Sequence, residues 1–149
     1  MKWNIKTKSL LEKSLKSNRR RKSGVSCIFY PILDYGAKIY KNKRQRNRCF
    51  NLQKIANEYF LAPSVGDRFE IEIDGKKFFG FFTQKVRVLK YSDNFYDEKL
   101  GKKLKQIGIN HYDLHSGNIG IIKRKRVCID FDSLSCVPNY NIIKQRISQ

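Results

Sequence analysis

Acidic residues are scarce in this chain, with 13 Asp and Glu against 32 Lys and Arg among 149 residues, so the formal net charge is +19. Long apolar runs are missing too, since the longest spans only a few residues whereas a membrane-spanning helix needs about 18. The N-terminus also lacks the apolar core of a signal peptide. We therefore expect a soluble chain without a signal peptide, cytoplasmic in its own cell or in a host cell.

Metal-ligand spacing of the zinc type is absent as well. The four cysteines form no C-x-x-C pair, and only two histidines could supplement them as ligands. Structural zinc sites need four such ligands at close spacing. We expect the cysteines to be thiols in a reducing compartment.

The apolar content shows that the chain should fold. It is 40% hydrophobic and 13% aromatic, with 10 Phe and 8 Tyr, which is too rich for a disordered basic tail. The length suits one compact domain or two small lobes that share a cleft.

The first 22 residues differ in composition from the rest of the chain. They hold nine Lys and Arg and one acid, and Leu10, Leu11 and Leu15 recur at helical spacing. We interpret residues 1–22 as a basic N-terminal arm or short amphipathic helix.

The remaining pattern mixes strands and helices. Short strands are expected between residues 23 and 40, and Asp74-Gly75 predicts a tight turn between strands 69–73 and 78–86. Apolar residues at helical spacing predict helices over 43–59 and 92–108. Two further strands are expected at 119–122 and 127–129.

The most informative stretch carries His111, Asp113 and Asn118 in an H-x-D-x-x-x-x-N pattern, and Asp130 follows twelve residues after Asn118. Phosphoryl transfer needs a carboxylate that orients and deprotonates the acceptor hydroxyl, together with oxygen ligands for Mg²⁺. A short hairpin between Asn118 and Asp130 would bring the two side chains together. We therefore predict that Asp113 is catalytic and that Asn118 and Asp130 bind Mg²⁺.

These motifs resemble the protein kinase-like superfamily, whose catalytic loop reads H-R-D-x-x-x-x-N and whose metal-binding segment reads D-F-G. The resemblance covers roughly residues 23–132. It implies a reduced two-lobed α+β fold that uses ATP and Mg²⁺. An N-lobe-like part, 23–90, would hold a small antiparallel sheet and one helix for nucleotide binding, and a truncated helical C-lobe-like part, 91–149, would carry the catalytic hairpin.

The resemblance also assigns residues around the nucleotide. Gly36-Ala-Lys38 looks like the V-A-I-K strand, so Lys38 would hold the α- and β-phosphates and act with the catalytic carboxylate. Gly24 sits where the loop that covers the phosphates belongs, and a glycine allows the backbone to approach closely. The strand and hinge beside adenine would contribute Thr83, Gln84 and Val86, while Asn118 and Asp130 would complete the nucleotide site through the metal.

Several positions depart from the family pattern. The helix over 43–59 has Glu58 as its only acid, near its end, and alignment on the helix exit would instead put Cys49, Phe50 or Asn51 where the family has the glutamate that pairs with the lysine. Asp132 replaces the glycine of D-F-G.

The residues expected to meet the acceptor depart from the family pattern as well. His115 stands where protein Ser/Thr kinases usually carry lysine, and D-L-H-x-G-N looks more like small-molecule phosphotransferases. Only 17 residues follow Asp132, too few for the usual activation segment and substrate platform. The resemblance is to minimal, truncated kinases of the bacterial effector or viral type.

Four side chains carry two interpretations each. His111 is expected to pack under the loop and bond to backbone rather than act as a base. His115 either lines the acceptor site or is simply exposed. Asp132 either joins Asp130 at the metal or caps the following turn, and Glu58 is either the partner of Lys38 or a solvated surface charge.

The interpretation we favour is a minimal kinase-like enzyme that moves the γ-phosphate of ATP to a hydroxyl, which we expect to be on Ser or Thr of a protein. A small-molecule phosphotransferase is one alternative. Another is a non-catalytic, kinase-derived module whose basic surface binds nucleic acid or an acidic protein. Charge at this density attracts polyanions and acidic surfaces, so an acidic macromolecule, docking on the basic N-terminal segment and the helix from Lys43, is an expected partner and activator.

Overall fold

The computed structural model describes residues 1–17, 22–23, 27–90, 92 and 95–148. The chain forms two compact units, and each interrupts the other in sequence. Unit 1 comprises Met1–Phe50 and Ser64–Lys85, and unit 2 comprises Asn51–Pro63 and Val86–Gln149.

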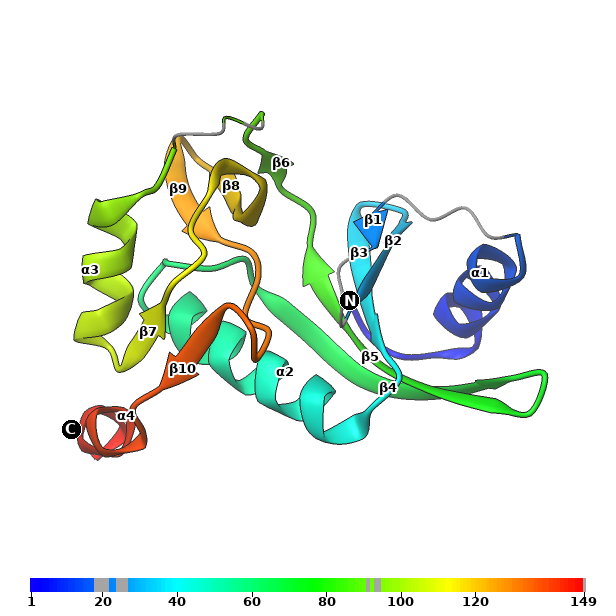
Figure 1. The fold of residues 1–149 in the computed structure, drawn as a ribbon. Coiled ribbons are helices and arrows are strands. Elements are labelled where there is room, and N and C mark those ends of the chain that lie inside the picture. Colours follow the sequence, from blue (N-terminus) through cyan, green and yellow to red (C-terminus); the bar gives the residue numbers. More distant parts are fainter. Residues whose placement is uncertain (18–21, 24–26, 91, 93–94, 149) are drawn as a thin grey trace. The chain divides into compact units, whose positions relative to one another are not determined.

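Unit 1 is built on one antiparallel sheet with the order β1-β2-β3-β5-β4 (Figure 1). Asp74 and Gly75, both at positive φ, join β4 to β5, which confirms the turn expected from the sequence. The strands are β1 Lys22–Ser23, β2 Ile28–Ile32, β3 Tyr35–Tyr40, β4 Val65–Ile73 and β5 Lys76–Gln84.

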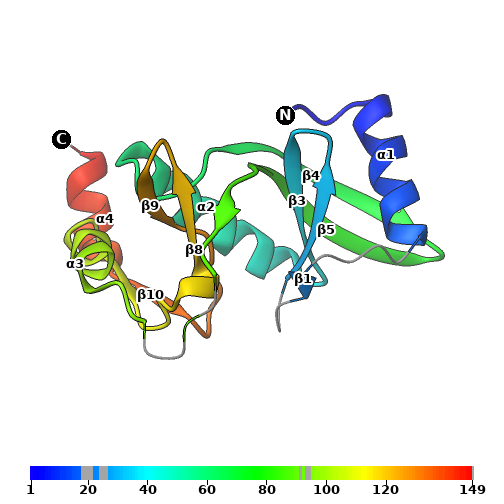
Figure 2. The same cartoon turned by 90° about the horizontal axis from the view of Figure 1, so that it is seen from above.

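One face of this sheet is covered by helix α1, Ile5–Lys16, as Figure 2 shows from above. Asn4 caps the helix through the backbone N–H of Thr7, and Leu11 is completely buried among sheet residues. Trp3 stacks on Phe69 with ring centroids 4.7 Å apart. The N-terminal segment therefore contains a helix, which was one of the two interpretations of residues 1–22. This helix contributes to the core of unit 1.

Helix α2, Lys43–Glu58, follows the expected span closely. The side-chain oxygen of Asn42 accepts the backbone N–H groups of Arg44 and Gln45 and so caps its start. Its first half packs on the other face of the sheet through Cys49, and its second half belongs to unit 2 through the buried Leu52.

The units differ from the expected division at 22 and 90 in three places. Residues 1–22 belong to unit 1 together with the sheet. Residues 51–63 belong to unit 2 rather than to the part that carries the sheet, and the later boundary falls between Lys85 and Val86. The physical reason is that the apolar stripe of α2 serves two cores in succession along the helix.

Unit 2 contains two small antiparallel sheets, β6-β8-β9 and β10-β7. Its helices and these strands contribute side chains to one buried core. Helix α3 is shorter than the expected 92–108. Its start is fixed by Asp97, whose side-chain oxygen accepts the backbone N–H of Leu100 and so caps the helix. Gly108 follows the helix at φ 90°. The elements are β6 Arg87–Val88, α3 Glu98–Gln106, β7 Ile109–His111, a 3₁₀ turn Ser116–Asn118, β8 Ile119–Ile122, β9 Lys125–Cys128, β10 Cys136–Pro138 and α4 Tyr140–Ile147.

The fold class is therefore α+β with antiparallel sheets and, within the residues that the structure describes, four α-helices. In the same described part of the chain, each helix is too short or too polar to cross a membrane. The four cysteines, all within that part, form no disulfide.

Candidate active site

The connection from β7 to β8 carries three of the predicted site residues. His111 ends β7, Asp113 lies two residues later in the connection, and Asn118 ends the 3₁₀ turn before β8. Leu114, between them, is completely buried and accepts the backbone N–H of Asp97 through its carbonyl. The loop is thus fixed to the core on one side, and it exposes Asp113 to solvent.

His111 joins the loop to the segment that contains Asp130. The residue is 5% exposed, its Nδ1 accepts the backbone N–H of Asp113 at 3.2 Å, and its Nε2 lies 2.7 Å from the carbonyl oxygen of Asp130. Because Nδ1 accepts, Nε2 carries the proton and donates it to that carbonyl. The expectation that His111 packs under the loop and bonds to backbone is confirmed.

Asn118 holds the side chain of Asp113 in place. Its Nδ2 donates to the carbonyl oxygen of Asp113 at 2.8 Å and to Oδ2 of the same residue at 3.2 Å. Both contacts use the amide nitrogen, so the amide oxygen of Asn118 faces the other way and is the atom a hard cation would take.

The hairpin β8–β9 brings Asp130 back to the loop, as the spacing predicted. Its register pairs Ile119 with Cys128, and the backbone N–H of Ile129 donates to the carbonyl of Asn118 at 3.0 Å. Asp130 therefore follows a residue bonded directly to Asn118. This hairpin turns through Lys123 and Arg124, both at positive φ.

The carboxylate of Asp130 is held from both sides. Its Oδ1 accepts the backbone N–H of Asp132 at 3.1 Å, and its Oδ2 accepts the hydroxyl of Ser135 at 3.2 Å. Ser135 is 3% exposed. Sequence reasoning missed Ser135, although its place five residues after Asp130 in a turn-rich segment is a weak signal for such a contact.

Asp132 caps the following turn. Its Oδ1 accepts the backbone N–H groups of Leu134 and Ser135 at 2.9 and 3.0 Å. Its carbonyl accepts those of Ser135 and Cys136. Of the two roles considered for Asp132, these contacts support the cap.

The donor set fits magnesium. In the described residues no group of three or more His, Cys, Asp or Glu is placed to hold a metal ion. Magnesium, however, commonly binds through one or two protein oxygens and completes its octahedral shell with phosphate and water. A fixed carboxylate at Asp130 and an outward amide oxygen at Asn118 are ligands of that kind.

His115 lies close to the carboxylate of Asp113. Its Nδ1 accepts the backbone N–H of Gly117 at 3.0 Å, and its Nε2 is 3.6 Å from Oδ1 of Asp113. The side chain is 38% exposed, so it lies at the surface beside Asp113 and can meet an acceptor there.

Three of the residues predicted around the nucleotide, Lys38, Thr83 and Gln84, lie in unit 1. Lys38 is half-buried in the middle of β3, on the sheet face that the first half of α2 covers, with Nζ 5.7 Å from the ring centroid of Phe81. Thr83 and Gln84 end β5, and Thr83 donates its hydroxyl to the carbonyl of Ser64.

The other residues predicted to bind the nucleotide do not lie in the described part of unit 1. Val86 belongs to unit 2, and Gly24 lies outside the described residues. Of the residues considered as partners of the lysine, Cys49 and Phe50 are in unit 1, whereas Asn51 and Glu58 are in unit 2, where Glu58 ends α2 as an exposed side chain. The pairing of these residues with Lys38 stays a prediction.

Burial of the His111 ring lowers its pKa below the ordinary value of 6.5, while the carbonyl and charge of Asp130 and the charges of Asp113 and Asp132 oppose this in part. The folded chain therefore binds fewer protons here than the unfolded chain as the pH falls. This contribution to stability is fully present above pH 6.5 and is lost as the pH drops below it.

We expect a His111→Gln variant to lose part of the acid sensitivity of folding. Glutamine can donate and accept in place of the neutral imidazole, but it does not titrate. The urea midpoint of the wild-type chain should fall more between pH 7.5 and 5.5 than that of the variant. His115→Gln, a change at a partly exposed histidine, is the matched control. A wild-type slope in His111→Gln would contradict the assignment.

No known family model, curated protein sequence or solved structure matches this chain.

Proposed function

We propose that this chain is a minimal kinase-like phosphotransferase that moves the γ-phosphate of ATP to a hydroxyl group with the help of Mg²⁺. The observation that carries the proposal is the bonded set His111, Asp113, Asn118 and Asp130. One imidazole bridges the loop and the Asp130 segment, and one amide holds the exposed carboxylate. A solvated turn has no need of such positioning.

Each residue has a role in this proposal. Asp113 accepts the proton of the acceptor hydroxyl and orients its oxygen toward the phosphorus atom. Asn118 and Asp130 would hold the metal, and His111 positions both segments. When bound, Mg²⁺ supplies positive charge that offsets the charge on the phosphate oxygens. Lys38, on β3, would bind the α- and β-phosphates.

The finer fold proposal is a reduced, two-lobed kinase-like arrangement. It is supported by the order of elements: the strand with Lys38, then α2, then the β4–β5 hairpin, then the loop with Asp113 and the hairpin that leads to Asp130. The same order is typical of the family that the motifs resemble.

A protein acceptor is favoured by the surface beside Asp113. Tyr112 is 67% exposed and Leu134 is 73% exposed, and the backbone N–H of Tyr112 bonds to the carbonyl of Ser135, which follows Leu134. Exposed apolar side chains next to a catalytic group suit contact with a macromolecule rather than with a small polar substrate.

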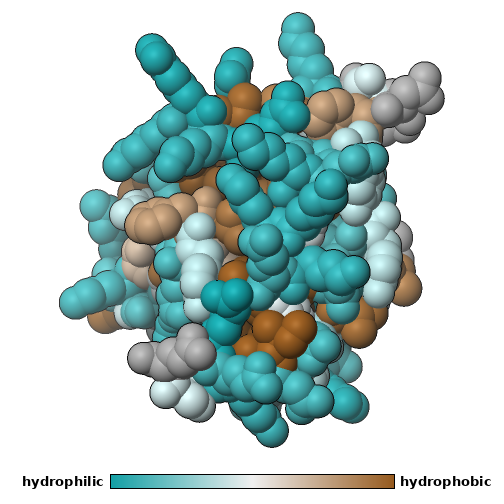
Figure 3. Space-filling view, turned by 90° about the vertical axis from the view of Figure 1, so that its left-hand side faces the viewer, coloured by the Kyte–Doolittle hydropathy of each residue, from teal (hydrophilic) through white to brown (hydrophobic). Residues whose placement is uncertain are grey.

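A second candidate, a polyanion-binding module, is favoured by the exposure of the basic residues. The unit 2 surface with α3 and α4 is largely hydrophilic (Figure 3). Its exposed cations include Lys102, Lys103 and Lys105 on α3. Charge of this kind binds polyanions without using Asp113.

The test uses the full chain with γ-labelled ATP, Mg²⁺ and either a cell extract, purified candidate proteins or a panel of small hydroxyl compounds. We expect label in protein and its loss when EDTA removes the metal. Label only in small molecules would favour the small-molecule alternative. Absence of label in every arm, together with tight, salt-sensitive binding of nucleic acid, would replace the enzyme by the second candidate.

A further inference from the structure

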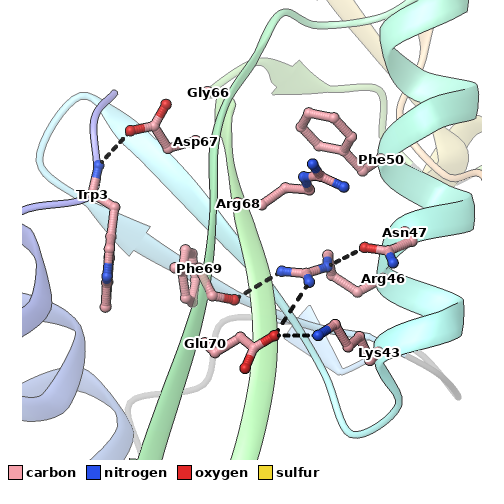
Figure 4. A pocket seen from close by; sticks show the side chains of 10 residues that line it. All are labelled: Trp3, Lys43, Arg46, Asn47, Phe50, Gly66, Asp67, Arg68, Phe69 and Glu70. Atoms are coloured by element: carbon pink, nitrogen blue, oxygen red, sulfur yellow. Dashed lines mark hydrogen bonds and ion pairs between the residues drawn. The ribbon is translucent and has the colours of Figure 1, made fainter.

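An open pocket of about 740 Å³ lies in unit 1 between the first half of α2 and the edge strand β4 (Figure 4). Alternate residues of β4 point to opposite faces of the sheet, so Arg68 and Glu70 face α2 while Phe69 faces the α1 side. The α2 wall is formed by Lys43, Arg46, Asn47 and Phe50.

Arg46 places a buried charge in this wall. The residue is 4% exposed, and its Nη1 donates to the carbonyls of Phe69 and Gly80 at 2.9 and 3.1 Å, while its Nε donates to Oδ1 of Asn47 at 2.8 Å. These three acceptors are neutral. They take the N–H groups of Nε and Nη1, and they leave the charge of the guanidinium to be balanced by other groups.

The carboxylates of the pocket balance this charge only in part. Oε1 of Glu70 is 3.9 Å from Nη2 of Arg46, but it is only 2.9 Å from Nζ of Lys43, and the Glu70 side chain is 48% exposed. Asp67 points to the other side of β4, where its Oδ2 accepts the backbone N–H of Trp3 at 2.9 Å.

Arg68 adds a further guanidinium. It lies over the ring of Phe50 with Cζ 5.0 Å from the centroid, and among the described residues the structure gives it no hydrogen-bond acceptor. Stacking holds the guanidinium flat while its N–H edges remain able to bind a carboxylate. Burial and then repulsion from Arg68 lower the pKa of Arg46, which is a sign that the positive charges are crowded.

We propose that this pocket binds an acidic segment of a partner protein, with a partner carboxylate on Arg68 and Lys43 and an apolar partner side chain against Phe50. Charge complementarity carries the choice of occupant, because Lys43, Arg46 and Arg68 line the pocket and, on the same face of β4, one half-exposed glutamate, Glu70, offsets them. The proposal concerns binding alone and does not rest on phosphoryl transfer.

The placement of Glu70 favours a protein over a nucleic acid. A phosphodiester backbone carries charge at every nucleotide and prefers an uninterrupted track of cations. Here a carboxylate stands between Lys43 and Arg46, which interrupts such a track. A peptide can place a single carboxylate at Arg68, where two parallel N–H···O bonds are available.

The experiment measures fluorescence anisotropy of a labelled synthetic peptide in which glutamates flank one phenylalanine, with the full-length chain. Arg68→Gln should weaken binding about tenfold, as expected for loss of a charge-assisted pair. Lys76→Gln is the matched control: it removes the same charge from an exposed residue of the same hairpin, outside the pocket. It should change the affinity by less than about twofold.

Further variants and probes keep the proposal open to refutation. If Arg68→Gln does not fold, as judged by its circular dichroism, Lys43→Gln takes its place, because Lys43 is an exposed side chain at the start of α2. Equal losses in the pocket variant and in Lys76→Gln would overturn the proposal. Undiminished binding of a peptide with Gln in place of Glu, no binding of the acidic peptide, or tighter Arg68-dependent binding of single-stranded DNA would also do so.

Discussion

Asp113→Asn is expected to reduce phosphoryl transfer by roughly 10² to 10⁴-fold, the usual contribution of a positioned general base. The amide cannot take the proton of the acceptor hydroxyl. The fold should survive, because Asn118 Nδ2 bonds to the backbone carbonyl of residue 113 as well as to its side chain. Affinity for Mg²⁺-ATP should stay within about twofold, since in the proposed reaction this side chain would meet the acceptor rather than the nucleotide.

The measurement combines initial rates with γ-labelled ATP and a separate titration with a fluorescent ATP analogue. Asp74→Asn is the matched control, because it makes the same change of charge at an exposed turn of unit 1. A fall in nucleotide affinity that matches the fall in rate would show that Asp113 has been given the wrong role.

Asp130→Asn is expected to weaken nucleotide binding at least about tenfold in the presence of Mg²⁺ and to have little effect in EDTA. The amide removes the negative charge that a hard divalent ion requires. The remaining oxygen can still accept the backbone N–H of Asp132, and the amide nitrogen can face Ser135, so the local structure is kept.

Asp132→Asn provides the comparison from the same turn. Its side-chain oxygen caps the backbone N–H groups of Leu134 and Ser135, and an amide oxygen performs the same task. Isothermal titration with Mg²⁺-ATP should therefore leave Asp132→Asn close to the wild type. If both variants lost the same affinity, the metal would have to be assigned to the pair rather than to Asp130.

The features that could be predicted from the sequence are those set by short-range chemistry. Asp74-Gly75 fixes its hairpin because both residues accept positive φ. The meeting of Asn118 with the Asp130 segment follows from a hairpin of fixed length between them. The α+β class follows because apolar residues recur at helical spacing in some segments and in strand-like patterns in others.

Other features depend on contacts between distant parts of the sequence. Strand β10, Cys136–Pro138, forms by pairing with β7. Its three residues are too few to show an alternating pattern that would predict a strand. The role of Asp132 depended on where the turn placed the N–H groups of Leu134 and Ser135. The apolar stripe of α2 indicated which residues are buried. It did not indicate that the two halves of the helix pack into different cores.

The burial of α1 limits how the positive N-terminal segment can be studied. Leu11 is completely buried, Trp3 stacks on Phe69, and the carbonyl of Met1 accepts the backbone N–H of Asp67. A truncation at residue 22 would therefore remove part of a cooperative folding unit together with the charge, and loss of partner binding would report unfolding as readily as docking. Glutamine scanning of the exposed lysines of α1 separates the two, because it changes the electrostatic field and leaves the buried side chains in place.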